Sequence, residues 1–245
     1  MDSTLYSLLN SKPDKNIAAL GFFSNYQVEE YFIEGKSALI FGRSDHLWAH
    51  ISSSSEIELS LLLSKYHTKT KYYYSVEDWM IPLIFEFGTP EWVMTTNRYI
   101  LQENAVLRSP EADIVKIDKG YASFIHENSD YKAFTSIAYI EDRLTKDISA
   151  GIIENNMLAA WGFTHDDGAL GFLHVLDKYR NRGYATEIML ALIQERKKTH
   201  KPVYGNIVPD NNASKNLVGK LGFKLDCKIS WIKLHSTELE DQSLF

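Results

Sequence analysis

The sequence predicts a mixed α+β protein in which helices flank a mostly antiparallel, twisted central sheet. Between residues 149 and 176, three apolar segments follow one another with short turn signals between them, as in an antiparallel meander. Beyond the meander, segments with helical periodicity alternate with short apolar strands, as in crossover connections. Apolar residues make up 44% and charged residues 24% of the chain, which is ordinary for a globular protein.

A length of 245 residues allows one large domain or two modest ones. The best boundary lies at residues 102–111, where Glu103-Asn104 and Arg108-Ser109-Pro110-Glu111 interrupt the apolar pattern. We therefore expect an N-terminal α/β domain of residues 1–105 and a C-terminal domain of residues 112–245.

The N-terminal half has a less regular pattern. Tyr72, Tyr73, Tyr74 and Trp79 form an aromatic cluster that either belongs to the core, the more frequent case, or lines a pocket. In order along the chain, we expect a helix at 16–23, strands at 28–33 and 37–41, a helix at 57–65 and a strand at 91–100.

The C-terminal half is clearer because turn signals separate its elements. Asn155-Asn156 and Asp167-Gly168 favour hairpin turns, and hydrophobic residues alternate along the last strand. We expect a strand at 114–117, a helix from there to 128, a helix at 136–145, strands at 149–154, 157–164 and 169–176, a helix at 183–197, a strand at 203–208, a helix at 212–221 and a strand at 227–234.

Charge and composition argue against several classes of protein. The net charge of −6 argues against a nucleic-acid partner. The N-terminus lacks the pattern of a secretory signal, and the longest uncharged apolar run, residues 80–85, is too short to span a membrane. One cysteine, Cys227, excludes an internal disulfide framework, and its apolar setting suggests a packed thiol. We expect a cytoplasmic protein without a membrane partner.

No motif points to a metal ion, a nucleotide or a serine nucleophile. The eight histidines are scattered, without a His-Glu-x-x-His pattern, so we expect no metal. A Gly-x-Gly-x-x-Gly or Walker-type loop and a Gly-x-Ser-x-Gly elbow are also absent from the sequence.

The most informative segment is residues 173–186, which leads from a strand through a basic turn into a helix. The helix should begin near Arg182 and Gly183, where the first backbone N–H groups lack intrahelical partners and the helix dipole adds positive potential. Such a position binds phosphate-like anions. Lys178 and Arg180 add charge, and Gly183 permits close approach or a positive φ. The alternative is a solvated basic turn.

Two motifs resemble those of a known family. The run Arg180-Asn181-Arg182-Gly183-Tyr184-Ala185 is similar to the Arg/Gln-x-x-Gly-x-Gly/Ala signature of the GCN5-related N-acetyltransferase (GNAT) superfamily. Residues 211–223 resemble its Asn-x-x-Ala/Ser-x-x-Leu-Tyr-x-Lys-Leu-Gly-Phe element. The sequences of both motifs are most similar to those of the FR47-like and glycine N-acyltransferase-like branch. The resemblance covers about residues 112–235, and by analogy the first 105 residues could be a degenerate copy of the same fold.

The resemblance implies acetyl-CoA, or another acyl-CoA, as co-substrate and an amine of a small molecule or amino acid as acceptor. It places the pyrophosphate on the N–H groups of residues 182–186 and the pantetheine arm between residues 173–175 and 203–208. Asn211 and Ser214 would contact the pantetheine arm and thiol end, although Asn211 could equally be a helix N-cap. The expected binding residues are Leu173, Val175, Arg180, Asn181, Arg182, Gly183, Tyr184, Ala185, Thr186, Asn211 and Ser214.

The catalytic residues follow less directly, because the sequence departs from the family pattern at two positions. Val218 stands at the place of the frequent general-acid tyrosine, and Ala169 near that of the frequent acidic residue. His174 is the candidate base or substrate contact, although alternation cannot say which way it faces if the strand is bulged.

Other residues that could take part are weaker candidates. They are His165, Asp166 and Asp167 in the hairpin turn, and Tyr184 and Tyr204 as substitute acids. A backbone N–H near Leu173 would be the oxyanion donor.

Three functions stay open: an N-acyltransferase for small amines, an inactive CoA-binding module, and an acetyltransferase for a protein lysine or N-terminus. A homodimer also stays open. The acceptor pocket would involve the loop at residues 122–134 and the loop after Trp231, and the N-terminal half could contribute to it; none of these carries a recognisable code.

Overall fold

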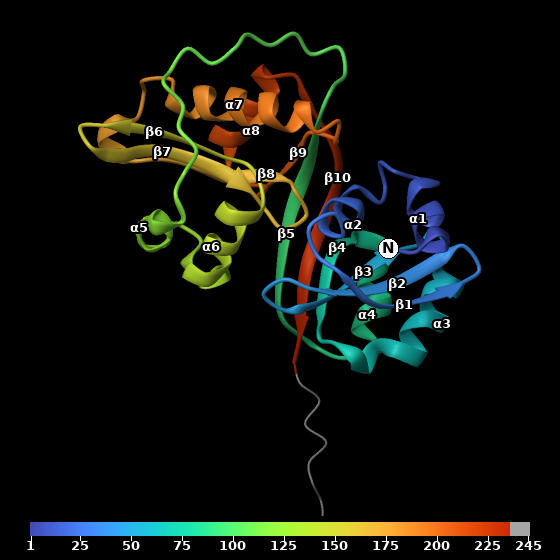
Figure 1. Cartoon of the computed structure of the whole chain (residues 1–245). Coiled ribbons are helices and arrows are strands. Elements are labelled where there is room, and N and C mark those ends of the chain that lie inside the picture. The colour runs from blue at the N-terminus through green and yellow to red at the C-terminus, as the bar shows by residue number, and fades with distance from the viewer. Residues whose placement is uncertain (236–245) are drawn as a thin grey trace, which may run out of the picture. The chain divides into compact units, whose positions relative to one another are not determined.

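A computed structural model of the protein describes residues 1–235 (Figure 1). The described residues form two compact units, one of residues 1–96 with 227–235 and one of residues 97–226. The sequence placed the boundary at 102–111 and assigned the whole last strand to the C-terminal half. In the structure the later part of that strand pairs with the N-terminal unit, where Ile229 lies opposite Glu77.

The N-terminal unit is a sheet with helices on both faces. Its strands pair in the order β1-β2-β3-β4-β10-β5; β1–β2 and β2–β3 are antiparallel pairs and β3–β4 is a parallel pair. Its elements are α1 (Ser3–Asn10), α2 (Ile17–Phe22), β1 (Val28–Glu34), β2 (Ser37–Arg43), β3 (Leu47–Ser52), α3 (Glu56–Tyr66), β4 (Tyr72–Glu77), α4 (Ile81–Phe85) and β5 (Pro90–Leu101), joined by the later part of β10.

The second unit repeats this succession of elements: two helices, three antiparallel strands, a helix, a strand, a helix and a strand. β6, β7 and β8 form one sheet, while β9 pairs with residues 97–100 at the end of β5. The elements are α5 (Ala122–Glu127), α6 (Ile137–Lys146), β6 (Ser149–Glu154), β7 (Met157–Thr164), β8 (Leu170–Val175), α7 (Tyr184–Lys198), β9 (Tyr204–Ile207), α8 (Asn212–Lys220) and β10 (Phe223–Leu234).

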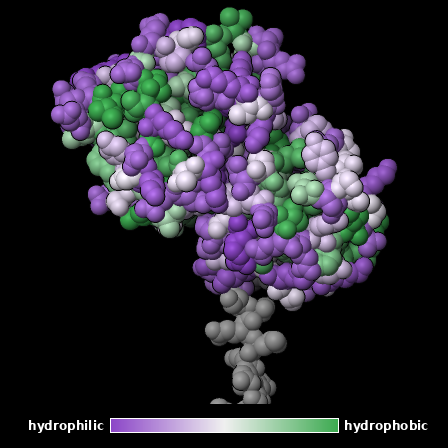
Figure 2. Space-filling view, in the orientation of Figure 1, coloured by the Kyte–Doolittle hydropathy of each residue, from purple (hydrophilic) through white to green (hydrophobic). Residues whose placement is uncertain are grey.

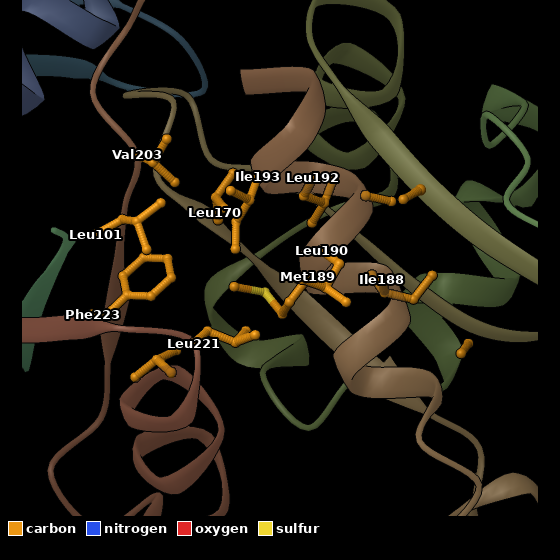
Figure 3. Close-up of a cluster of buried hydrophobic side chains, with 14 of the residues drawn as sticks. Leu101, Leu170, Ile188, Met189, Leu190, Leu192, Ile193, Val203, Leu221 and Phe223 are labelled. Carbon is orange, nitrogen blue, oxygen red and sulfur yellow. The ribbon is translucent and has the colours of Figure 1, made fainter. Parts of the chain in front are cut away.

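The main core of the second unit forms around α7, whose apolar face packs on β6, β7 and β8 (Figure 3). Ile188 and Leu192 are fully buried there, as the helical spacing in the sequence predicts. On the opposite face of the same three strands, α5 and α6 cover Trp161 and Phe163. These two packed faces fix where β8 ends and where α7 begins.

The face in view in Figure 2 is mostly hydrophilic, with hydrophobic residues in separate groups. None of the described helices has the length and apolar character that spanning a bilayer requires.

Some expected elements differ from the structure. Residues 114–117 form a single bridge, Val115 with Gly151, rather than a strand. The sequence pattern did not predict α1, β3, β4 or α4. The tyrosine cluster lies on β4, where Tyr73 and Tyr74 are buried and therefore belong to the core. Cys227 is half-buried against aromatic residues of the same unit.

Candidate functional site

The helix that follows β8 begins where the sequence predicts. α7 starts at Tyr184, and Gly183 is its N-cap with φ +80° and ψ −2°, in the left-handed region that favours glycine. A Cβ added at Gly183 would meet nothing within 4 Å, so the space beside this backbone is open. Asn181, two residues earlier, also has a positive φ of 62°.

The first N–H groups of this helix are unpaired. Among the residues that the structure describes, the N–H groups of Arg182, Gly183, Tyr184 and Ala185 donate no hydrogen bond, and Gly183 offers no side-chain cap. The Thr186 N–H, in contrast, donates to the Gly183 carbonyl at 2.9 Å. Four donors in succession at the positive end of a 15-residue helix can receive an anion.

The basic side chains around these donors form exposed ion pairs. Arg180 lies 2.8 Å from Asp177, and Arg182 lies 2.8 Å from Glu154. The Lys178 ammonium lies 4.9 Å from the centre of the Tyr179 ring. Because the exposed pair of Arg180 with Asp177 contributes little stability, an incoming anion can compete for Arg180 at small cost.

A β-bulge interrupts β8 beside the site. Trp161 lies opposite His174 and Phe163 opposite Gly171, so Phe172 and Leu173 share one partner position, and Phe172 has a φ of 48°. A bulge leaves one residue without its partner in the ladder.

The bulge also sets the direction of the side chains on β8. Phe172 packs in the cluster beneath α5 and α6, whereas Leu173 and Val175 pack against the core around α7. His174 points to the side of Phe172, because its ring stacks on Trp161 with centroids 4.6 Å apart. It is half-buried, and burial is the main cause that lowers its pKa.

β8 and β9 belong to different sheets. They meet near Leu170 and Gly205, where a Cβ on Gly205 would lie 2.9 Å from the Leu170 carbonyl oxygen. Within residues 1–235, no strand pairing joins β8 to β9. The outer edge of β8 therefore keeps backbone groups available next to the start of α7.

Asn211 is the N-cap of α8. Its side-chain oxygen accepts the Ser214 N–H at 3.0 Å, so the capping alternative is present in the structure. The Asn211 amide group retains its donor, and Ser214 is half-buried.

The hairpin turn between β7 and β8 is buried. Asp167 accepts the Ala169 N–H at 2.9 Å, and the Tyr204 hydroxyl donates to the Asp167 carbonyl at 2.8 Å. Burial raises the pKa of Asp167 to about 7 and lowers that of His165 to about 4. These contacts join the beginning of β8 to the beginning of β9, and they engage the Tyr204 hydroxyl in the fold.

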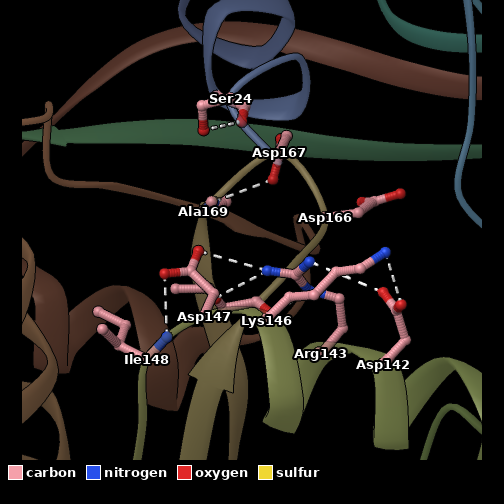
Figure 4. Close-up of polar contacts among 12 residues, drawn as sticks. Ser24, Asp142, Arg143, Lys146, Asp147, Ile148, Asp166, Asp167 and Ala169 are labelled. Atoms are coloured by element: carbon pink, nitrogen blue, oxygen red, sulfur yellow. Dashed lines mark hydrogen bonds and ion pairs between the residues drawn. The ribbon is translucent and has the colours of Figure 1, made fainter. Parts of the chain in front are cut away.

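Two buried arginines beside this turn, Arg143 and Arg196, were not anticipated; Figure 4 shows Arg143 beside Asp147. Arg143 donates to the Thr164 carbonyl at 3.2 Å, and Asp147 lies 3.3 Å from both Arg143 and Arg196. The four-residue spacing of Arg143 and Asp147 was the available signal. The network stabilises the turn and does not reach the N-terminus of α7.

Glu154 and Glu187 were also missed. Glu154 contacts Arg182 and Tyr184, and Glu187 binds the segment before α5. The described residues contain no group of three or more potential ligands that could hold a metal ion.

Comparisons with known proteins concern the fold and one family of sequences. A family model described as FR47-like protein matches residues 148–232, which include both sequence motifs. The chain resembles an X-ray structure of a Drosophila protein with a TM-score of 0.78 and 18% identity, covering 96% of this chain and 97% of that one. No curated protein matches the chain.

Two further structures carry family names. One is a GCN5-related N-acetyltransferase from Kribbella flavida (TM-score 0.59, 10% identity, 90% of this chain and 94% of that one). The other is an acetyltransferase from the GNAT family from Colwellia psychrerythraea (TM-score 0.52, 13% identity, 93% and 97%).

The chain therefore has the fold of GNAT-family acetyltransferases. Residues 148–232 of this fold match the FR47-like family model.

Proposed function

We propose that this protein is an acyl-CoA-dependent N-acyltransferase that moves an acetyl group to an amine of a small molecule or amino acid. The observation that carries the proposal is the set of four unpaired N–H groups from Arg182 to Ala185. The start of α7 offers these donors and the positive end of its dipole to a diphosphate. Gly183 leaves room for it, because its Cβ position faces open space.

The remainder of a CoA molecule has a suitable path beside β8. An extended pantetheine arm carries amides that can pair with the free strand edge near Leu173 and Val175. Because β8 and β9 do not pair, the arm can lie between them. This path leads from the N-terminus of α7 to the bulge at Phe172 and Leu173.

Acyl transfer needs a neutral amine and a donor for the oxyanion. An alkylammonium has a pKa of about 10, so a base must accept its proton at neutral pH. His174 stands next to the bulge, and since burial lowers its pKa it is neutral and can accept that proton. An unpartnered backbone N–H at the bulge would stabilise the oxyanion as the nitrogen bonds to the acyl carbon.

The thiolate leaves as the carbon–sulfur bond breaks. A thiol has a pKa of about 8.5, so the thiolate is a tolerable leaving group without a general acid. Val218 cannot donate a proton. The two substitute tyrosines are engaged elsewhere, Tyr204 with Asp167 and Tyr184 with Glu154.

A thiol-release assay with acetyl-CoA and a panel of amines tests the activity. We expect turnover with small amines or amino acids and less with lysine peptides; the reverse order would favour a protein acceptor. CoA binding without any turnover would support an inactive module instead.

The binding site is tested by Gly183→Val, which puts a side chain into the open space at a positive φ. We expect CoA binding to be lost, whereas Gly219→Val, at an exposed glycine that also meets nothing within 4 Å, should bind CoA normally. Gly183→Val protein that keeps both its fold and its CoA affinity would contradict the site.

A further inference from the structure

Glu154 is held rigidly at the end of β6. It pairs with Met157 across a two-residue hairpin whose turn residues, Asn155 and Asn156, have φ values of 52° and 60°. Such turns match the twist of the strands and fix the register of the hairpin. The backbone of Glu154 is thereby set by the sheet and not by the loop that it contacts.

From this position Glu154 binds both sides of Gly183. One carboxylate oxygen accepts from Arg182 at 2.8 Å, and the other accepts from the Tyr184 hydroxyl at 2.6 Å. The Glu154 carbonyl lies 3.4 Å from the Tyr179 hydroxyl. Both carboxylate oxygens take side-chain donors, so the N–H groups of residues 182–185 stay unpaired.

The loop needs such support. Asn181 and Gly183 both have positive φ, a conformation that these two residue types tolerate but to which neither is confined. The N-cap supplies no side-chain hydrogen bond. Contacts from outside the loop must therefore select this conformation, and Glu154 reaches it from about thirty residues away in sequence.

We propose that Glu154 is a positioning residue whose carboxylate clamps Arg182 and Tyr184, so that the N–H groups between them are fixed in place for the diphosphate of the acyl carrier. This inference rests on the proposed function. The competing idea is that the Glu154 carboxylate opposes binding of the diphosphate, either by charge repulsion or by taking its place at the donors. The geometry favours the clamp, because Glu154 does not occupy the backbone donors.

The two ideas predict opposite signs for a binding experiment. We would measure CoA affinity by titration calorimetry for the wild type, Glu154→Ala and Glu154→Gln. For a clamp, Glu154→Ala weakens binding about tenfold, the equivalent of one charge-assisted contact, and Glu154→Gln less, because its amide oxygen still accepts one donor. For a competing carboxylate, both variants bind CoA more tightly.

Glu195→Ala is the matched control. Glu195 forms an exposed pair with Lys198 at 2.6 Å near the other end of α7, and its loss should leave CoA affinity unchanged. Tyr184→Phe should weaken binding in the wild type and add little in Glu154→Ala, since both changes open one clamp. In the free protein, ¹⁵N order parameters of residues 182–185 should fall in Glu154→Ala and not in Glu195→Ala.

The outcomes separate the clamp from the proposed function. If the wild type binds no CoA, the proposed function is wrong, and so is the proposal that Glu154 positions the N–H groups for CoA. A wild type that binds CoA, together with Glu154→Ala that binds it equally well or better, overturns the clamp alone.

Discussion

Glu187 fastens the segment that precedes α5 to the first turn of α7. Its carboxylate accepts the N–H of Glu111 at 2.6 Å and that of Ala112 at 3.2 Å, and it pairs with Arg108. The Glu187 side chain is 10% exposed and that of Arg108 is 46% exposed. Glu187→Gln would keep the shape and one acceptor oxygen but remove the charge.

The expected loss follows from these contacts. A hydrogen bond to a charged group contributes about 1.5–3 kcal/mol and a neutral one about 0.5–1.5 kcal/mol. The exposed Arg108 adds little through its ion pair. With two backbone donors affected and one neutral acceptor kept, we expect a loss of about 2 kcal/mol, or roughly thirtyfold in local opening.

The stabilisation that the Glu187 carboxylate contributes should be lost at low pH. The hydrogen bond from Arg108 is the main cause that lowers the pKa of Glu187 from 4.5 to about 2. Because the folded-state pKa lies below the unfolded one, this contribution is present above pH 4.5 and is lost as the pH falls toward 2.

Hydrogen exchange of the Glu111 and Ala112 amides measures this directly. At pH 7 they should exchange roughly thirtyfold faster in Glu187→Gln than in the wild type, and the difference should shrink toward pH 2. Glu141→Gln, at an exposed position on α6, is the control and should change neither amide. Equal exchange in wild type and Glu187→Gln at pH 7 would refute the reasoning.

Three further predictions concern stability. Asn211→Ala should cost about 1 kcal/mol in chemical unfolding, because α8 loses its N-cap, and an unchanged midpoint would contradict the cap. Burial lowers the pKa of His165 to about 4, so its side chain should stay neutral at pH 5.5 in an NMR titration. Because the unfolded chain binds this proton near pH 6.5, the stability of the fold should decrease as the pH falls below 6.5. Protonation of His165 near pH 6.5 in the folded protein would contradict its burial. Burial raises the pKa of Asp167 to about 7, so wild-type stability falls as the pH rises from about 4 to 7. The free energy of unfolding of Asp167→Asn should therefore rise relative to that of the wild type between pH 4 and pH 8. A difference between the two proteins that stays constant over this range would refute the prediction.

Local signals explain what the sequence could predict of the fold. Asn155 and Asn156 both adopt the left-handed conformation that their residue type tolerates, and Gly183 does so at the start of α7. The alternation along β10 also holds, because Ile229 and Trp231 pack in one cluster and Ile232 in another. In each case the residue type or its spacing is a local signal that can be read from the sequence.

Non-local pairing explains the failures. β3 and β4 form a parallel pair that depends on the crossover through α3, and their short segments carry no simple alternation. Residues 114–117 have the composition of a strand, but in the described part of the chain only Val115 pairs with another strand, in a single bridge to Gly151.

Much of the candidate site depends on long-range contacts in the same way. The direction of His174 depends on the bulge opposite Gly162, which alternation cannot reveal. Glu154 lies 28 residues from Arg182, and Glu187 lies 76 residues from Glu111, so neither contact leaves a local pattern.

The central claim is that the unpaired N–H groups at the start of α7 receive the diphosphate. The most direct measurement is a ¹H–¹⁵N titration of the protein with CoA. The account predicts that the amide signals of Arg182, Gly183, Tyr184 and Ala185 shift most and saturate together. If CoA binds while these four signals stay in place and others move, the diphosphate lies elsewhere and the claim is wrong.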